Sequence, residues 1–137
     1  MTMTDCVFCK IVAGEIPAAK VFEDDLTLAF MDAGQVNPGH IIVAAKAHRE
    51  TILDIDDELA GALFRTAARM ARATDAAFGP AGLTLLQANR PAGFQTVPHI
   101  HLHVLPRHAD DGVELVWPAK NPPPAELQAL AAKIAGD

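Results

Sequence analysis

Three histidines alternate with apolar residues in one short segment of the sequence, PHIHLHVLPR, which runs from residue 98 to residue 107. On a strand, alternate side chains point to the same face, so His99, His101 and His103 would stand together there. Imidazole is the side chain best suited to nucleophilic and acid–base chemistry near neutral pH. We therefore predict a reactive strand, with the intervening apolar residues in the core and a row of imidazoles facing solvent on the opposite surface.

The length of this strand excludes one metal ion bound by all three histidines. His99 and His103 would lie about 13 Å apart at the usual rise of a strand. A Zn–N bond is only about 2.1 Å long, so a straight strand cannot bring three such rings to one ion. A neighbouring pair can share an ion. The group is therefore expected to divide, with one end used for metal binding or structure and the rest for chemistry.

A loop of small and polar residues, AGFQT, leads into the histidines. Its backbone N–H groups and the Thr96 hydroxyl can meet phosphate oxygens, so loop and histidines together predict an anion site. The alternative is a half-exposed strand that merely carries polar side chains. Strict alternation of three histidines favours the anion site.

Both cysteines of the chain lie in one C-x2-C pair, Cys6 and Cys9. This pair is too closely spaced to staple a fold, and in a reducing compartment it indicates half of a zinc site or a redox pair. A thioredoxin-like pair would follow a strand and open a helix. Here the pair lies at the extreme N-terminus, which favours zinc.

Secondary-structure signals around these motifs predict an α+β fold in a single domain over residues 1–137. An apolar stripe at three- and four-residue steps indicates one long amphipathic helix from about residue 56 to 78, stopped by FGPAG. A proline-led segment, NPPPAELQALAAKIAGD, predicts a short C-terminal helix, and CVFCKIVAGEI predicts a helical turn. About five strands of an antiparallel sheet are expected, in the segments AKVFEDD, LTLAFMD, HIIVAAK, GLTLLQAN and HIHLHVLPR.

Net charge and hydropathy limit the classes of partner that the protein is expected to bind. The formal net charge is −6 and the basic residues are scattered, which argues against binding a nucleic acid polymer but permits a single nucleotide. No apolar run approaches the length of a membrane span or of a signal peptide core. We therefore expect a soluble cytoplasmic protein that does not bind membranes.

The sequence resembles the histidine-triad nucleotide-binding (HIT) family over nearly its whole length. HIHLHVLP matches the family's motif of three histidines separated by apolar residues, DCVFCKIVAGEIPA looks like its usual opening, and AFMDAGQVNPGHIIVAAKAH looks like its central strands. The opening with C-x2-C is most similar to the phosphoramidase-type branch. The resemblance implies a homodimer that binds purine nucleotides, such as AMP derivatives, and cleaves or transfers at the α-phosphate.

The same resemblance implies roles for the histidines. His101 matches the nucleophile, which would form a covalent nucleotidyl-histidine that water resolves. His103 matches the histidine that contacts phosphate oxygens and assists with protons. His40 matches a fourth active-site histidine, expected close to His99, the first histidine of the triad and itself counted with the catalytic set. His108 has no counterpart and is expected at the surface.

Four polar residues are implied in nucleotide binding by their match to the family. Gln95 and Thr96 match a pair that meets the phosphate and the leaving group. Asn89 matches an asparagine on the phosphate or ribose side. Asp32 matches the acid that accepts hydrogen bonds from the ribose hydroxyls.

A structural zinc ion is implied as well. In family members with the N-terminal C-x2-C pair, zinc is held by two cysteines and two histidines, which match Cys6, Cys9, His48 and His99 here. Four N and S ligands form a closed site that would join the N-terminus to the sheet. Alone, His48 would be assigned to the surface and the cysteines would be unligated thiols.

Two features depart from the family pattern or lie beyond it. Phe94 stands where the family usually has glycine, and the loop from Asn89 to Gln95 is one residue short, which bears on leaving-group preference. Trp117 lies where related proteins often send a segment towards the partner subunit's active site. A packed, partly buried Trp117 is the alternative.

Several functions remain open within and beyond the resemblance. A phosphoramidase-type hydrolase or nucleotidyl transferase is the leading hypothesis, and the intact His103 favours the hydrolase branches. The alternatives are a dinucleoside polyphosphate hydrolase, a nucleotide-binding regulatory protein with little activity, and a metalloenzyme with catalytic zinc on the His-x-His pair. No serine-elbow or P-loop motif offers another route.

Overall fold

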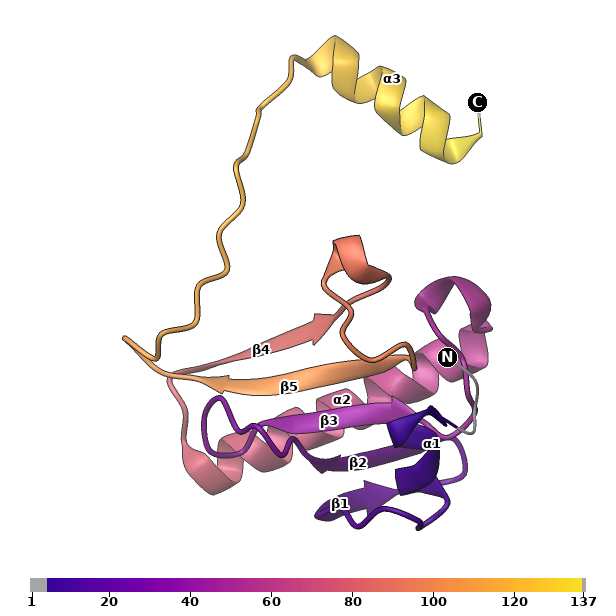
Figure 1. The fold of residues 1–137 in the computed structure, drawn as a ribbon. Coiled ribbons are helices and arrows are strands. Elements are labelled where there is room, and N and C mark those ends of the chain that lie inside the picture. The colour runs from indigo at the N-terminus through magenta and orange to yellow at the C-terminus, as the bar shows by residue number, and fades with distance from the viewer. Residues whose placement is uncertain (1–4, 137) are drawn as a thin grey trace.

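A five-stranded antiparallel sheet forms the centre of the structure, a computed structural model that describes residues 5–136 (Figure 1). The strand order β1-β2-β3-β5-β4 places β5 beside β3 and leaves β4 at the edge of the sheet. Its members are β1 (Lys20–Glu23), β2 (Thr27–Met31), β3 (Ile41–Ala45), β4 (Gly82–Gln87) and β5 (His101–Arg107). The α+β class and the number of strands are as the sequence predicted.

The long helix α2 (Asp57–Phe78) covers one face of this sheet. It begins where Asp56 accepts a hydrogen bond from the backbone N–H of Leu59, and it ends at Gly79, whose φ of 57° few other residues adopt readily. Its buried side packs on Val43, Leu102 and neighbouring strand residues. The predicted helix over residues 56–78 is confirmed, because capping signals and apolar period agree at both of its ends.

The other face of the sheet is covered too, which corrects the expected row of solvent-facing imidazoles. The short helix α1 (Val7–Val12) lies over it, and Phe8 and Ile11 of this helix pack against Phe30 and Ile42 of the sheet. His99 and His101 lie beneath this layer and are buried. Periodicity could not show this, since apolar runs such as IIVAA fit a strand with one or two covered faces.

Two short 3-10 helices, η2 (Ile52–Asp54) and η3 (Pro91–Gly93), lie in the connections before α2 and after β4. After β5 the chain runs in an extended path away from the sheet to α3 (Pro124–Ala135), which lies apart from the sheet and α2 (Figure 1). No residue of α3 is buried. Within residues 5–136, no helix combines the length and the apolar character needed to cross a bilayer.

Candidate functional site

Four side chains from distant parts of the sequence meet where α1 contacts the sheet: Cys6, Cys9, His48 and His99. Their ligand atoms all lie within 4.8 Å of one another. His99 Nδ1 lies 3.2 Å from Cys6 Sγ, and His48 Nδ1 lies 3.3 Å from both Cys9 Sγ and His99 Nδ1. Corners of a tetrahedral zinc site with N and S ligands are about 3.3–3.8 Å apart. The four residues that the sequence predicted as ligands thus have the spacing of a tetrahedral metal site.

The orientation of the His99 ring favours metal binding through Nδ1. His99 Nε2 lies 2.6 Å from the carbonyl oxygen of Ala45, so Nε2 carries the proton and donates it. The Nδ1 lone pair then points at the two sulfur atoms. Metal-binding histidines commonly donate their second ring N–H in this way, which fixes the ring and its tautomer.

The chemistry of the sulfur atoms also fits a cation. Burial, and next the neighbouring Cys6, raise the pKa of the Cys9 thiol to about 11. A bound divalent metal would reverse this effect, since thiolate is the form that ligates metals. Neither cysteine is in a disulfide.

His101 lies two residues further along the chain and is held by the opposite nitrogen. Its Nδ1 lies 2.7 Å from the carbonyl oxygen of His99 and donates to it. This leaves the Nε2 lone pair free of any hydrogen bond to the described residues. Burial lowers the pKa of His101, which is only 6% exposed, so the ring is neutral at neutral pH. A neutral imidazole with a free Nε2 is the form that can attack an electrophile.

Phe8 fixes the plane of the His101 ring. The two rings meet edge to face, with centroids 4.9 Å apart at an interplanar angle of 87°. The sequence reading missed Phe8, although a signal was present. Phe8 lies between Cys6 and Cys9, and their predicted metal partner His99 is two residues from His101.

Asp32, His40 and His103 form a second polar cluster beside His101. His40 Nε2 lies 2.8 Å from His103 Nδ1 and 3.4 Å from Asp32 Oδ2. The backbone N–H of Val36 donates to His40 Nδ1 over 3.4 Å, so His40 carries its proton on Nε2 and donates to His103. Burial, followed by the charges of His101 and His40, lowers the pKa of His103 to about 4. His103 is therefore neutral as well, with its own proton on Nε2.

The position of His40 corrects one expectation. His40 was expected near His99, but it lies against His103, at the other end of the triad. The antiparallel register explains this, because Ile42 of β3 pairs with His103 and Ala44 pairs with His101. Residue 40 therefore lies at the end of the histidine row that is furthest from residue 99.

Two cavities meet at this part of β5. The first, of about 590 Å³, has walls from α1, β2 and the segment from Ile16 to Ala19, and Asp32 is among the residues that line it. The second, of about 320 Å³, lies against β4 and the loop that carries Phe94. Both are lined by Thr96, His101 and His103 and by no other common residue. A ligand over His101 can thus extend into two separate spaces.

Only some of the other predicted binding residues lie at the cavities beside the histidines. Gln95 lines the second cavity, but its side chain also closes the loop, accepting from the Arg90 N–H and donating to the Glu50 carbonyl. Asn89 lines neither cavity, and its amide bonds to Gln87 and to the backbone N–H of Ile52. The structure therefore brings Thr96 and Gln95 to the histidines and leaves Asn89 apart. His108 is exposed, as expected.

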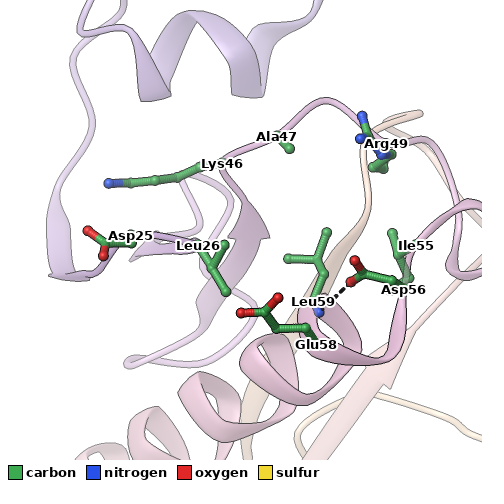
Figure 2. Close-up of a pocket in the computed structure, with 9 residues that line it drawn as sticks. All are labelled: Asp25, Leu26, Lys46, Ala47, Arg49, Ile55, Asp56, Glu58 and Leu59. Atoms are coloured by element: carbon green, nitrogen blue, oxygen red, sulfur yellow. Dashed lines mark hydrogen bonds between the residues drawn. The ribbon is translucent and has the colours of Figure 1, made fainter.

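A further hollow lies at the start of α2 and contains none of these groups (Figure 2). The side chains labelled in Figure 2 include basic Lys46 and Arg49 and acidic Asp25, Asp56 and Glu58, and Asp56 is occupied in capping the helix. Lys46 is also paired with Glu23 at 3.1 Å. Two basic and three acidic side chains line this hollow, so their charges largely cancel and it offers no concentrated field for a ligand.

Comparison with known proteins identifies the family to which this chain belongs. The model of the HIT domain matches residues 13–110, and the chain belongs to the HIT family. It is 42% identical over 134 residues to "Protein hit" of Bacillus subtilis, covering 96% of this chain and 92% of that protein. It is 33% identical over 130 residues to an adenosine 5'-monophosphoramidase of Schizosaccharomyces pombe, covering 94% and 95% of the two chains.

Solved structures of the family share the fold. A crystal structure of a HIT family member from Bacillus subtilis superposes with a TM-score of 0.91 at 41% identity, over 96% of both chains. A zinc-bound histidine triad protein from Mycobacterium smegmatis has a TM-score of 0.77 at 31% identity, over 98% of this chain and 99% of that one. The relatives named as monophosphoramidases indicate a hydrolase of nucleotide derivatives.

Proposed function

We propose that this protein hydrolyses purine nucleotide derivatives at the α-phosphate, with adenosine 5'-phosphoramidates as substrates and His101 as the nucleophile. The observation that carries this proposal is the state of His101. Its ring is buried and neutral, its Nδ1–H is bound by a backbone carbonyl, and its Nε2 is free where two cavities meet. The names of the relatives support the substrate class.

The reaction proceeds in two displacements at phosphorus. Nε2 of His101 forms a bond to phosphorus as the P–N bond to the amine breaks, and the amine takes a proton from solvent as it leaves. Water then attacks phosphorus, the bond to His101 breaks, and the proton returns to solvent. Splitting one displacement into two easier steps is the advantage of covalent catalysis.

The remaining site residues bind and orient the substrate. Asp32, which lines the first cavity, accepts hydrogen bonds from the ribose hydroxyls, which places the purine between α1 and β2. His103 donates its Nε2–H to a phosphate oxygen and is held for this by His40. The Thr96 hydroxyl contacts the same phosphate, while the N–H groups of Gly93, Phe94 and Gln95 donate within the loop and Gln95 keeps it closed. Asn89 acts on the ribose or phosphate side in the family pattern, and here it would act by supporting the loop.

Zinc is the cofactor that we propose for Cys6, Cys9, His48 and His99. The set of two sulfur and two nitrogen donors is closed, which suits a structural ion and leaves no position for a reactive water. Held by these four residues, zinc would stabilise the attachment of α1 to the sheet, and α1 carries Phe8 against His101. A reducing location such as the cytoplasm keeps the two thiols available for it.

A homodimer is part of the proposal. β4 lies at the edge of the sheet, and apolar side chains near it are exposed, including Phe64 of α2 at 61% and Leu86 of β4. Trp117 is 78% exposed on the extended segment, so it is not a packed aromatic within the single subunit. A second copy would cover these surfaces. Light scattering should give twice the mass of one 14.5 kDa chain, and Phe64→Glu should reduce it to one.

The test of the function is a substrate panel followed by trapping of the intermediate. Wild-type protein is offered an adenosine phosphoramidate, a dinucleoside polyphosphate and AMP alone, and a reaction stopped in acid-free denaturant is analysed by mass spectrometry. We expect turnover of the phosphoramidate and an AMP adduct on His101. AMP binding without turnover of any substrate would instead support the nucleotide-binding regulatory protein. An adduct on another residue would refute His101 as nucleophile.

A further inference from the structure

Phe94 is an exposed aromatic residue in a strained backbone conformation. Its φ is 78° and its ψ is 19°, a left-handed conformation that bulky residues rarely adopt. The side chain is 79% exposed. Glycine would adopt this conformation without strain. Both strain and exposure oppose folding, and a residue kept in spite of them points to a ligand.

The surroundings of Phe94 show where this ligand would lie. Phe94 lines the second cavity, which also contains His101 and His103. Most of the wall is apolar, with Val36, Leu86, Leu105, Val113 and Leu115 among its residues. Apart from the groups assigned to the phosphate, its polar side chains include Gln95, which is engaged in the loop, Thr84, which accepts from Arg107, and Glu114, which is exposed.

The division of the site between its two cavities assigns the part of the substrate that reaches Phe94. Resting on the function proposed above, the nucleoside occupies the first cavity, where Asp32 lies. The phosphate lies over His101, where both cavities meet. The group expelled from phosphorus must then lie outside the first cavity, and the second is the space that adjoins His101 and His103.

We propose that Phe94 makes this protein select substrates whose leaving group is an amine with an aromatic or other apolar substituent. As the P–N bond breaks, the electron pair stays on the amine nitrogen, which takes its proton from solvent, while the substituent stays in contact with the Phe94 ring. Aromatic rings gain from edge or offset contacts with each other in addition to removal from water. A small polar amine would gain neither.

The experiment compares two adenosine 5'-phosphoramidates that differ only in the amine, 2-phenylethylamine or the similarly basic ethanolamine. The ratio of their kcat/KM values removes effects common to both substrates. For wild-type protein we expect a ratio of about ten or more in favour of the phenyl substrate, the usual effect of an apolar group in an apolar pocket. Phe94→Gly and Phe94→Asn should both bring the ratio close to one, and both residues accept a positive φ, so the loop is kept.

Phe94→Leu is the matched control, since it keeps an apolar side chain and should keep most of the preference. A ratio that is unchanged in Phe94→Gly would overturn the inference while the proposed function stands. The same holds for a ratio that falls in Trp117→Ala but not in Phe94→Gly, since the selecting aromatic would then be Trp117. Failure of wild-type protein to hydrolyse either substrate would instead refute the proposed function, and the inference with it.

Discussion

His99 and His101 are two residues apart, and each is oriented by a ring N–H that donates to a backbone carbonyl. The donating nitrogen differs between the two rings. In His99 the Nε2–H is bound by Ala45, and Nδ1 faces two sulfur atoms. In His101 the Nδ1–H is bound by His99, and Nε2 faces the cavities. Under the proposed function, this difference in tautomer, more than the side chain itself, makes one ring a metal ligand and the other a nucleophile.

The two clusters around these rings also differ in their partners. His99 is surrounded by soft sulfur donors and another imidazole in a closed set, whereas His101 has Phe8 on one side and open space on the other. One cluster is therefore suited to hold an ion permanently, and the other to bind and release a substrate. If this comparison is right, a substitution in one cluster should leave the property of the other cluster, zinc binding or turnover, largely unchanged.

The largest effect is expected from His101→Ala. Removing the nucleophile should lower kcat for an adenosine phosphoramidate by at least about 10³-fold. AMP binding, measured by calorimetry, and zinc content, measured by atomic absorption, should stay near those of wild-type protein. Turnover at the wild-type rate would break the assignment of chemistry to this cluster.

Cys9→Ser should have the opposite effects, a loss of zinc and stability with turnover largely retained. Losing one sulfur ligand should remove most of the bound zinc and lower the melting temperature on the order of 10 °C. At a temperature where the variant is folded, kcat should fall less than about tenfold, because no ligand of this cluster lines either cavity. Folded, zinc-free protein with no turnover at all would show that the metal takes part in the reaction.

The lowered pKa of His103 predicts how stability and turnover differ in their response to acid pH. Its pKa is lowered from 6.5 to about 4, first by burial. Between these values the unfolded chain binds a proton that the folded chain does not, so the free energy of unfolding falls as pH falls from 6.5 towards 4. The folded protein, however, keeps His103 neutral, and the pKa of His101 is lowered in the same direction. We therefore expect kcat/KM to stay at its neutral-pH value as the pH is lowered below 6.5. A fall in kcat/KM with a midpoint at or above pH 6.5 would contradict this.

His108→Ala is expected to have the smallest effect. His108 is exposed and belongs to neither cluster. Zinc content, melting temperature and kcat should all match wild-type protein within error. A measurable change in any of them would mean that the division into two clusters omits a histidine.

The sequence predicted this molecule best where a local pattern also determined the tertiary structure. The α2 helix and the strands followed from apolar period and capping residues, and the set Cys6, Cys9, His48 and His99 came from the family resemblance. Two expectations were wrong, the solvent-facing histidines and the position of His40. Both depend on packing between segments far apart in the chain, the cover provided by α1 and the register between β3 and β5. The αL conformation of Phe94 was not predicted either, because a bulky residue gives no local signal for a positive φ.

The hydrogen bond between His101 and residue 99 has a consequence for how this site can change over generations. The acceptor is a main-chain carbonyl, which every amino acid supplies, so the contact does not depend on the imidazole of His99. During evolution, the side chain at position 99 and the metal site with it can therefore be lost while the hydrogen bond that orients the His101 ring is retained. Under the proposed function, the zinc half of the site is therefore replaceable in a way that the half with the nucleophile is not.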